Sequence, residues 1–444
     1  MNNKIVRLLG ASGLTMAGGL AHAAGYALIE QSASGMGNAY AGGAAAAEDA
    51  STIYFNPAGM MRLEPRAQAL AALHWISPKA EFTDQGSHKH AAAGGSALTG
   101  NDDGGVDALV PNFYYVMPLS DTTRFGLGIN APFGLSTEYN KSWAGRYHAI
   151  ESSLMSININ PSFAVQMTER LAFGFGFNFQ YVDVTLSSAI DQQTLTLALP
   201  PHLRVTEDGY ATLTGDNFDR LNTGVNAGLL YQATDATRLG MAYRSRIKHH
   251  VDGEADFDVS PILAASGRFV DTGLKASVTV PATLSLSVYH AFNDRWALMA
   301  DATKTYWSVF KELRIEYDNP LQPDTVTTAD WDNSWRYALG VNYQLNDQWL
   351  LRAGAALDQS PIPNAEHRTP RIPDSDRRWL AIGASYKSSE RLSFDVGYAH
   401  LFVSDTKINN TLEVKPPFDA LNATLKGEYE SSVDILSVQG QWLF

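Results

Sequence analysis

The 444-residue sequence contains no cysteine and few charged residues. Without cysteine the chain has no disulfide framework, no thiolate metal site and no thiol nucleophile. Only 18% of its residues are charged, whereas soluble globular chains carry about 25%. The formal net charge of -13 disfavours nucleic acid as a partner, because phosphate binding requires a basic surface.

Long apolar runs are also missing from the sequence. A helical membrane protein needs runs of about 20 apolar residues, and the mean hydropathy here is -0.16. Aromatic residues make up 11% of the chain, which excludes intrinsic disorder. The composition therefore fits neither a soluble globular protein nor a helical membrane protein.

The first 23 residues have the three parts of a secretory signal peptide. Lys4 and Arg7 precede a charge-free apolar stretch, residues 8–20, which is too short to span a bilayer. Ala21-His22-Ala23 then matches a small-x-small cleavage site. The alternative is a buried N-terminal helix. We expect cleavage after Ala23 and export, which leaves the periplasm, secretion or the outer membrane as destinations.

Bulky apolar residues alternate with small or polar ones along several stretches. The clearest set of bulky residues is Leu171, Phe173, Phe175, Phe177, Phe179 and Tyr181. The same period recurs within residues 276–288, 335–343, 392–398 and 436–444. Alternation places the bulky residues on one face of a strand. One such strand fits a soluble sandwich equally well, but many long ones after an export signal favour a transmembrane barrel with its apolar face outward.

Six short polar breaks separate seven longer segments rich in Gly, Pro and Asp. The breaks lie at 120–122, 168–170, 234–236, 293–295, 346–348 and 388–390. Short turns on one side and long loops on the other are typical of outer-membrane barrels. Six turns and seven loops join fourteen strands. The sequence therefore predicts an all-β fold, an antiparallel transmembrane β-barrel of about 14 strands over residues 63–444.

The last strand predicts where the barrel is inserted. Its alternation ends on the aromatic carboxy-terminal residue Phe444. We interpret this end as a signal for the outer-membrane assembly machinery. We therefore expect a monomer in the outer membrane of a Gram-negative bacterium, surrounded by outer-membrane lipid.

Residues 24–62 do not alternate and are rich in Gly and Ala. A fourteen-strand barrel is too wide for its own side chains to fill, so we expect this segment to lie in the lumen as a plug, or hatch. The alternative is a flexible periplasmic tail, but the aromatic and aliphatic residues in the segment argue against it. The predicted organisation is a signal peptide (1–23), a hatch (24–62) and a barrel (63–444).

The hatch contains a distinctive set of residues, Gly25, Tyr26, Gly35, Gly37, Asn56, Pro57 and Ala58. With these residues it resembles the N-terminal hatch of the FadL family of outer-membrane long-chain fatty-acid transporters. The resemblance covers essentially the whole chain after the signal peptide, and the Asn-Pro-Ala element is its most specific part. Residues 130–140 resemble the family's kinked third strand, with Gly134 at the kink.

The resemblance implies a transport mechanism for hydrophobic molecules. Extracellular loops capture the molecule, a lumen pocket beside the hatch receives it, and a gap at the kink releases it sideways into the bilayer. The residues expected to form the gap are Ala131, Pro132, Phe133 and Gly134. The residues expected at the apolar capture surface are Leu195, Leu197, Leu199, Leu203, Phe257, Ile262 and Leu263. A plain strand end and loop self-packing are the respective alternatives.

One departure from the family bears on the substrate. Fatty-acid-transporting members use a basic residue to hold the carboxylate, but residues 171–203 contain no Lys or Arg. Arg244, Lys304 and Arg352 are basic candidates elsewhere, more often charges that solvate a lumen than ligands. Uptake of uncharged aromatic or alkane hydrocarbons is therefore the alternative to fatty-acid uptake, and a general porin is the second alternative.

Motifs of catalysis are missing from the sequence. It contains neither H-E-x-x-H nor G-x-S-x-G. We therefore expect a transporter rather than an enzyme, with no cofactor, no metal site and hydrophobic small molecules as its partners.

Overall fold

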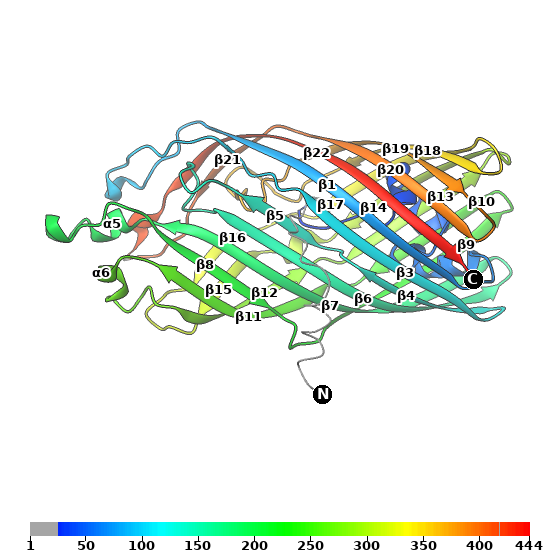
Figure 1. The fold of residues 1–444 in the computed structure, drawn as a ribbon, viewed down its shortest axis with the longest axis horizontal. Helices are drawn as coiled ribbons and strands as arrows, with labels where there is room; N and C mark the ends of the chain where they lie inside the picture. The colour runs from blue at the N-terminus through cyan, green and yellow to red at the C-terminus, as the bar shows by residue number, and fades with distance from the viewer. Residues whose placement is uncertain (1–24, 417) are drawn as a thin grey trace.

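The computed structural model describes residues 25–416 and 418–444. The expected signal peptide, residues 1–23, lies outside the described residues. Fourteen antiparallel strands form a closed barrel wall, as predicted (Figure 1). In order around the wall they are β1 (Gln68–Asp84), β3 (Ala108–Ser120), β4 (Thr123–Asn130), β6 (Glu151–Thr168), β7 (Leu171–Ile190), β9 (Asn222–Thr234), β10 (Thr237–Arg244), β13 (Thr283–Ala291), β14 (Trp296–Thr305), β17 (Ser334–Gln344), β18 (Trp349–Asp358), β19 (Arg377–Lys387), β20 (Leu392–Val403) and β22 (Thr424–Leu443).

The last strand closes the wall on the first. β22 pairs with β1 from Gln68↔Leu443 to Asp84↔Gly427, and with β20 on its other edge. Closure satisfies the backbone hydrogen bonds of both end strands inside the hydrocarbon layer, where no water is present to replace them. None of the helices among the described residues is long and apolar enough to cross a membrane.

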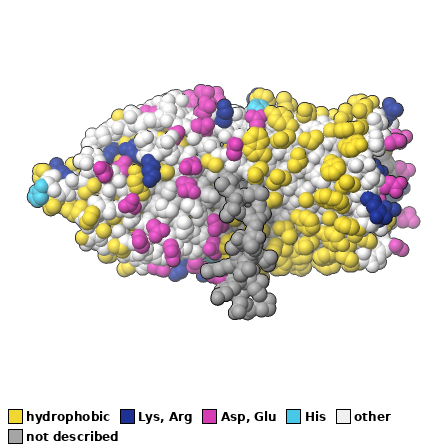
Figure 2. Space-filling view, viewed as in Figure 1, with side chains coloured by type: hydrophobic (Ala, Val, Ile, Leu, Met, Phe, Trp, Pro, Cys, Tyr) yellow, Lys and Arg dark blue, Asp and Glu magenta, His cyan; other side chains and the backbone are white. Residues whose placement is uncertain are grey.

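The alternation sorts the side chains as the sequence predicts. On β7, Phe175 and Phe177 are 39% and 48% exposed, whereas Gly174 and Gly176, which alternate with them, are buried. On the face drawn in Figure 2, apolar side chains gather in a broad band over the half of the barrel that carries the short turns. Aromatic pairs such as Trp296–Tyr343, with ring centroids 4.4 Å apart, lie beside those turns, at the place of an interfacial girdle.

Shorter strands and helical turns extend the wall at the opposite, extracellular end (Figure 1). The strands are β2 (Asp102–Asp103), β5 (Gly134–Glu138), β8 (Gly209–Asp216), β11 (Ile247–Asp258), β12 (Thr272–Val280), β15 (Glu312–Tyr317), β16 (Thr325–Thr328) and β21 (Thr406–Thr411). The helices are η2 (Ala91–Ala93), α5 (Gln192–Thr196), η3 (Pro201–Leu203), α6 (Pro261–Ala264), η4 (Trp307–Val309) and η5 (Asp419–Leu421). The long loops therefore project from the apolar band on one side only.

The segment before the wall folds as four short helices against the inner side of the barrel. They are α2 (Ala33–Gly37), α3 (Gly43–Ala46), α4 (Thr52–Phe55) and η1 (Pro57–Arg62). The helices are too short to be stable alone, so their packing against the wall holds them. We call residues 25–62 the hatch segment.

Inward-facing glycines of the wall make room for the hatch backbone. A Cβ atom at Gly174 would lie 2.3 Å from the backbone nitrogen of Ala58. A Cβ atom at Gly240 would lie 2.0 Å from the carbonyl oxygen of Ala44. Real Cβ atoms do not approach other atoms so closely. The wall therefore fits this hatch only because these positions carry no side chain.

Replacing Gly174 with Val is expected to displace the hatch while leaving the barrel closed, because the new side chain points at Ala58 and not at a neighbouring strand. Conductance of the purified protein in planar bilayers should rise. Gly440→Val is the control, since the nearest neighbour of a Cβ atom there is the Trp442 side chain at 3.0 Å. Equal conductance of the two variants would contradict a fitted hatch.

Candidate functional site

The barrel wall is interrupted where the third strand changes direction. β4 ends at Asn130 and β5 begins at Gly134. The β3–β4 ladder ends at the pair Phe113↔Ile129. Above it, β5 pairs with β6, and within the described residues no pairing with β3 is found. One edge of β3 is thus left without a strand partner over residues 108–112.

The start of the hatch segment fills part of this interruption. Leu28 N–H donates to the Pro132 carbonyl at 2.8 Å, and Gly134 N–H donates to the Tyr26 carbonyl at 2.9 Å. Ala27 and Phe133 therefore form an isolated antiparallel bridge. Pro132 has no N–H to give to a ladder, so a wall strand cannot continue unbroken through this point.

Aromatic rings surround the first described residues of the hatch. The Tyr26 ring is buried, with ring centroids of Phe133, Trp307, Phe310 and Trp331 at 4.8–5.9 Å. We call these four side chains the aromatic cage. Burial raises the pKa of the Tyr26 phenol, so the ring is uncharged at neutral pH.

The backbone of Gly25 packs directly against the aromatic cage. Its φ angle is +66°, and a Cβ atom there would lie 2.7 Å from the Trp331 ring. Its N–H donates to the Asp374 carboxylate at 2.9 Å. The residue must therefore be glycine for the cage to close over it.

A cavity of about 120 Å³ lies between the hatch segment and the wall. The hatch contributes mainly apolar residues, namely Ala27, Leu28, Ile29, Tyr40, Gly43, Ala44, Tyr54, Phe55 and Pro57. The wall contributes Asn226, Ala227, Ala242, Tyr243, Arg244, Thr283, Ser285, Asp301, Thr303, Thr305, Ser334, Arg336 and Asp358. The cavity therefore has an apolar side and a polar side, and residues 27–29 of the hatch start connect it with the interruption in the wall.

Two arginines and two aspartates line the polar side of the cavity. Arg336 donates from Nη2 to the Ala39 carbonyl at 2.8 Å, while its Nε and Nη1 have no hydrogen-bond partner among the described residues. Arg244 donates to the Tyr54 carbonyl at 3.0 Å. Arg336 is therefore the cavity cation with unused donors.

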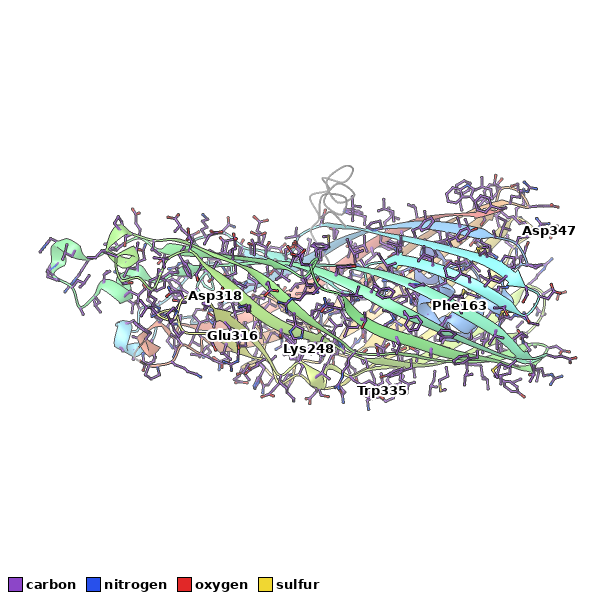
Figure 3. The ribbon with its side chains drawn as sticks, turned by 90° about the horizontal axis from the view of Figure 1, so that it is seen from below. Phe163, Lys248, Glu316, Asp318, Trp335 and Asp347 are labelled. Atoms are coloured by element: carbon purple, nitrogen blue, oxygen red, sulfur yellow. The ribbon has the colours of Figure 1, made fainter. Side chains whose placement is uncertain are left out.

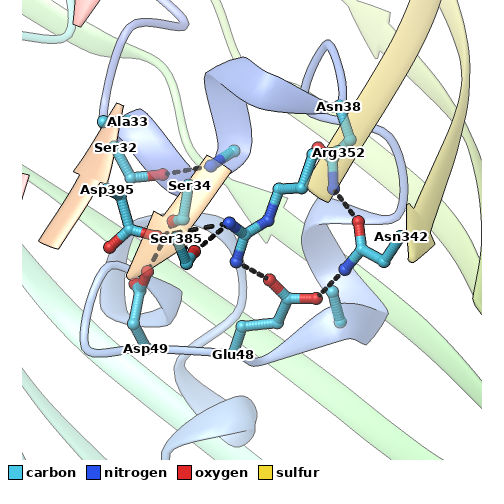
Figure 4. A network of polar contacts seen from close by, with 12 residues as sticks. Ser32, Ala33, Ser34, Asn38, Glu48, Asp49, Asn342, Arg352, Ser385 and Asp395 are labelled. Atoms are coloured by element: carbon cyan, nitrogen blue, oxygen red, sulfur yellow. Dashed lines mark hydrogen bonds and ion pairs between the residues drawn. The ribbon is translucent and has the colours of Figure 1, made fainter. Parts of the chain in front are cut away.

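Arg352, by contrast, anchors the hatch (Figure 4). Its guanidinium lies 2.9 Å from a Glu48 carboxylate oxygen and 3.2 Å from an Asp395 carboxylate oxygen. Gln439 joins the same network by donating to Asp49 at 3.1 Å. Arg352 thus pairs with one carboxylate of the hatch and one of the wall, so its role is to hold the hatch to the wall.

Lys304, the third basic candidate, does not face the lumen. Its position on β14 alternates with the buried, inward-facing Met299 series, and its ammonium lies 5.3 Å from the ring centroids of Tyr306 and Trp335. Figure 3 shows Trp335 on the outer surface of the barrel. The expectation that Lys304 solvates the lumen is not met, because the strand phase turns it to the outer face.

The Asn-Pro-Ala element holds the hatch turns to each other and to the wall. Asn56 Nδ2 donates to the Ala44 carbonyl at 2.6 Å and to the Leu229 carbonyl at 3.0 Å. Asn56 Oδ1 accepts from Ala58 N–H at 3.0 Å, and Pro57 begins η1. This single side chain therefore connects α3, η1 and β9.

The two other glycines of the hatch motif sit at close approaches. A Cβ atom at Gly35 would lie 2.6 Å from the Tyr40 ring, and one at Gly37 would lie 2.9 Å from the Cα atom of Gly383 on β19. Gly37 and Gly383 thus bring the hatch and wall backbones into direct contact.

The expected capture residues lie at the extracellular end, away from the hatch cavity. Leu197 and Leu203 are exposed, while Leu195, Leu199, Phe257 and Ile262 are half-buried and Leu263 is buried. Their two loops touch, since Ser260 N–H donates to the Gln192 side chain at 2.7 Å. The two loops are therefore joined at this point, and both carry apolar side chains.

The sequence contained a usable signal for Arg336. It alternates with Trp335 and Tyr337 on one strand, so its phase is inward. Nothing in the sequence places Asp301, Trp307 or Trp331 beside the hatch, since these residues come together only across strands. Among the described residues, no group of three or more His, Cys, Asp or Glu side chains is placed to hold a metal ion.

Comparison with known proteins gives a consistent result. A family model described as "Outer membrane protein transport protein (OMPP1/FadL/TodX)" matches residues 14–444. The chain is 31% identical over 416 residues to outer membrane protein P1 of Haemophilus influenzae, covering 88% of each chain. It is 30% identical over 414 residues to the long-chain fatty acid transport protein of Escherichia coli K12, covering 88% of this chain and 90% of that one.

Solved structures share the fold. A FadL homologue of Pseudomonas aeruginosa superposes with a TM-score of 0.84 at 24% identity, covering 94% of this chain and 99% of that one. The toluene transporter TodX of Pseudomonas putida gives a TM-score of 0.68 at 19% identity, covering 95% of this chain and 100% of that one.

Replacing Arg352 with Met is expected to loosen the hatch, because Glu48 and Asp395 lose their shared cation. Breaking a buried ion pair by removing one partner costs about 3–5 kcal/mol. The hatch of the folded variant should become sensitive to trypsin, measured by the cleavage rate at Arg62. Arg378→Met, an exposed position on β19, is the control, and an unchanged cleavage rate in Arg352→Met would count against the anchoring role.

Proposed function

The chain belongs to the OMPP1/FadL/TodX family of outer membrane transport proteins, and from that premise we propose that it takes up long-chain fatty acids or similar hydrophobic molecules by lateral release. The family consists of transporters, and the chain is an outer-membrane protein of the Gram-negative type. The observation that carries the proposal is the interruption between β3 and β5, filled by the start of the hatch.

The proposed route has three stages. The joined apolar loops at the extracellular end, residues 191–208 and 259–271, capture the molecule. It passes to the cavity beside the hatch, and then leaves through the interruption at Ala131–Gly134 into the outer leaflet. Each stage keeps an apolar solute against apolar surface, whereas a water-filled pore would offer it no favourable contact.

The hatch segment serves in this proposal as a plug. Wall glycines and the Arg352 network seat its body, while its start is held by two backbone hydrogen bonds at the interruption, by the Asp374 carboxylate and by the aromatic cage. We propose that the contacts of the start are released while the body stays seated. A general porin, the second alternative, would need neither the seat nor the movable start.

The partners of the folded chain follow from its surface. We propose that the assembly machinery of the outer membrane recognises β22 with its aromatic end Phe444, and that the apolar band contacts lipid directly. Since the ring of wall strands closes within one chain, the barrel can function as a monomer.

A reversible staple across the interruption tests lateral release. Ala27 and Phe133 form a non-hydrogen-bonded antiparallel pair, whose Cα atoms are typically about 4.5 Å apart, within the range of a disulfide. In Ala27→Cys/Phe133→Cys, oxidation should abolish oleate uptake by cells and reduction should restore it. The chain has no native cysteine to interfere.

The matched control places a disulfide beside the interruption without closing it. Phe113→Cys/Ile129→Cys joins two wall strands that are already paired, so oxidation there should leave uptake unchanged. Uptake that persists in the oxidised Ala27/Phe133 variant would rule out release at this point.

The substrate head group is proposed to meet Arg336. Its Nε and Nη1 are unused, and a guanidinium with two adjacent donors binds a carboxylate in a bidentate manner. Asp301 and Asp358 balance the two cavity arginines in formal charge. A cavity without net formal charge favours the alternative of an uncharged aromatic substrate. Its volume of about 120 Å³ also fits that alternative, because a cavity of similar size in another protein holds benzene.

Arg336→Gln separates the two substrates. If a carboxylate is bound there, oleate affinity of the purified protein should fall by about tenfold or more while toluene affinity stays the same, since a charge-assisted hydrogen bond contributes about 1.5–3 kcal/mol. Calorimetric titration of both ligands measures this. Saturable toluene binding with no oleate binding to the wild type would establish the hydrocarbon alternative.

A further inference from the structure

A cationic groove lies at the extracellular end, apart from the hatch cavity. It is formed between β16 and residues 410–415 and has a volume of about 290 Å³. Its apolar lining is Pro323, Val326, Leu412 and Val414, and its cations are Arg268, Arg314 and Lys415. With Asp324 and Glu413 as its acids, the groove is formally positive in a chain whose net charge is -13.

Arg268 is held in this groove without an acidic partner. The side chain is only 8% exposed, and its guanidinium carbon lies 3.8 Å from the ring centroid of Phe418 and 4.8 Å from that of Phe269. Nε donates to Gln322 at 3.0 Å, but Nη1 has no hydrogen-bond partner among the described residues. A buried cation with a free donor is costly unless an anion completes it.

The acids of the groove do not serve this purpose. Asp324 pairs with Arg314 at 3.1 Å. Both carboxylate oxygens of Glu413 accept hydrogen bonds from Thr328, at 2.9 and 2.8 Å. Among the described residues no carboxylate lies within ion-pair distance of Arg268 or Lys415.

Apolar surface continues from the cation in a way that suits an amphiphile. Leu321 is 61% exposed and packs beside Gly267, the residue before Arg268. Asn319 ties these two loops together by donating to the Gly267 and Arg268 carbonyls at 2.9 and 3.1 Å. An anionic head on the guanidinium would therefore leave an attached hydrocarbon chain against Leu321, Leu412 and Val414.

We propose that this groove binds the carboxylate of an amphiphilic acid, with Arg268 as its anchor. The identification of that acid with the transported molecule rests on the proposed function. A phosphate would satisfy the same nitrogen, but it would gain nothing from the apolar lining, so the observations favour a carboxylate with a hydrocarbon chain.

A single-cysteine reporter tests the groove directly. Val414→Cys, labelled with a polarity-sensitive fluorophore, is titrated at pH 7.5 with laurate, lauryl alcohol and inorganic phosphate. Laurate should saturate the fluorescence signal, and the affinity for lauryl alcohol should be lower by about tenfold or more. Inorganic phosphate should not compete with laurate. Phosphate that competes as well as laurate would overturn the assignment to an amphiphile.

Two substitutions then test the anchor in the reporter background. Arg268→Gln removes the charge. Arg268→Met also removes it but keeps apolar contact with the rings of Phe269 and Phe418, and it serves as the second variant in case Arg268→Gln misfolds. Both should lose the preference for laurate over lauryl alcohol, while Arg268→Lys should keep part of it. Lys248→Gln removes an exposed cation on β11 and should change nothing. An unaltered preference in Arg268→Met overturns the proposal.

The outcome is distinguishable from failure of the proposed function. Oleate uptake by cells without any laurate response of the reporter contradicts the groove alone. A laurate response without uptake of oleate contradicts transport and leaves the groove standing.

Discussion

The structure depends on one constraint: backbone hydrogen-bonding groups inside a bilayer must find partners within the protein. Most of the wall meets it through the ladder, which closure of β22 on β1 completes, whereas one edge of β3 has no strand partner over residues 108–112. At the third strand the ladder fails between Asn130 and Gly134, and the hatch start supplies the missing partners through Tyr26 and Leu28. These two backbone hydrogen bonds are therefore part of what completes the wall at this point.

Different contacts hold the body of the hatch and its first residues, which lie at the interruption in the wall. Its body is fixed by glycine positions of the wall, by Asn56 and by the Arg352 network. Its start is held by two backbone hydrogen bonds, by the Asp374 carboxylate and by aromatic contacts. In the proposed route, a hydrophobic molecule would exchange apolar contacts with the rings around Tyr26 while the body of the hatch stays seated.

The charges in the lumen have distinct tasks despite their similar burial. Arg352 meets carboxylates of both hatch and wall, whereas Arg336 meets a single carbonyl and keeps two nitrogens unused. At the extracellular end Arg268, in a partly apolar groove, likewise has a guanidinium nitrogen without a hydrogen-bond partner among the described residues. An unsatisfied buried donor costs free energy, and in a transporter that cost can be recovered when an anionic ligand arrives.

The sequence by itself determined the barrel, because a period of two and short polar turns are local properties of a strand and its ends. It gave the strand number, the inward phase of Arg336 and the position of the break at Pro132. Tertiary structure alone decided that Trp307 and Trp331 enclose Gly25 and that Ala27 pairs with Phe133. These contacts join residues more than a hundred positions apart, and only the tertiary fold brings them together.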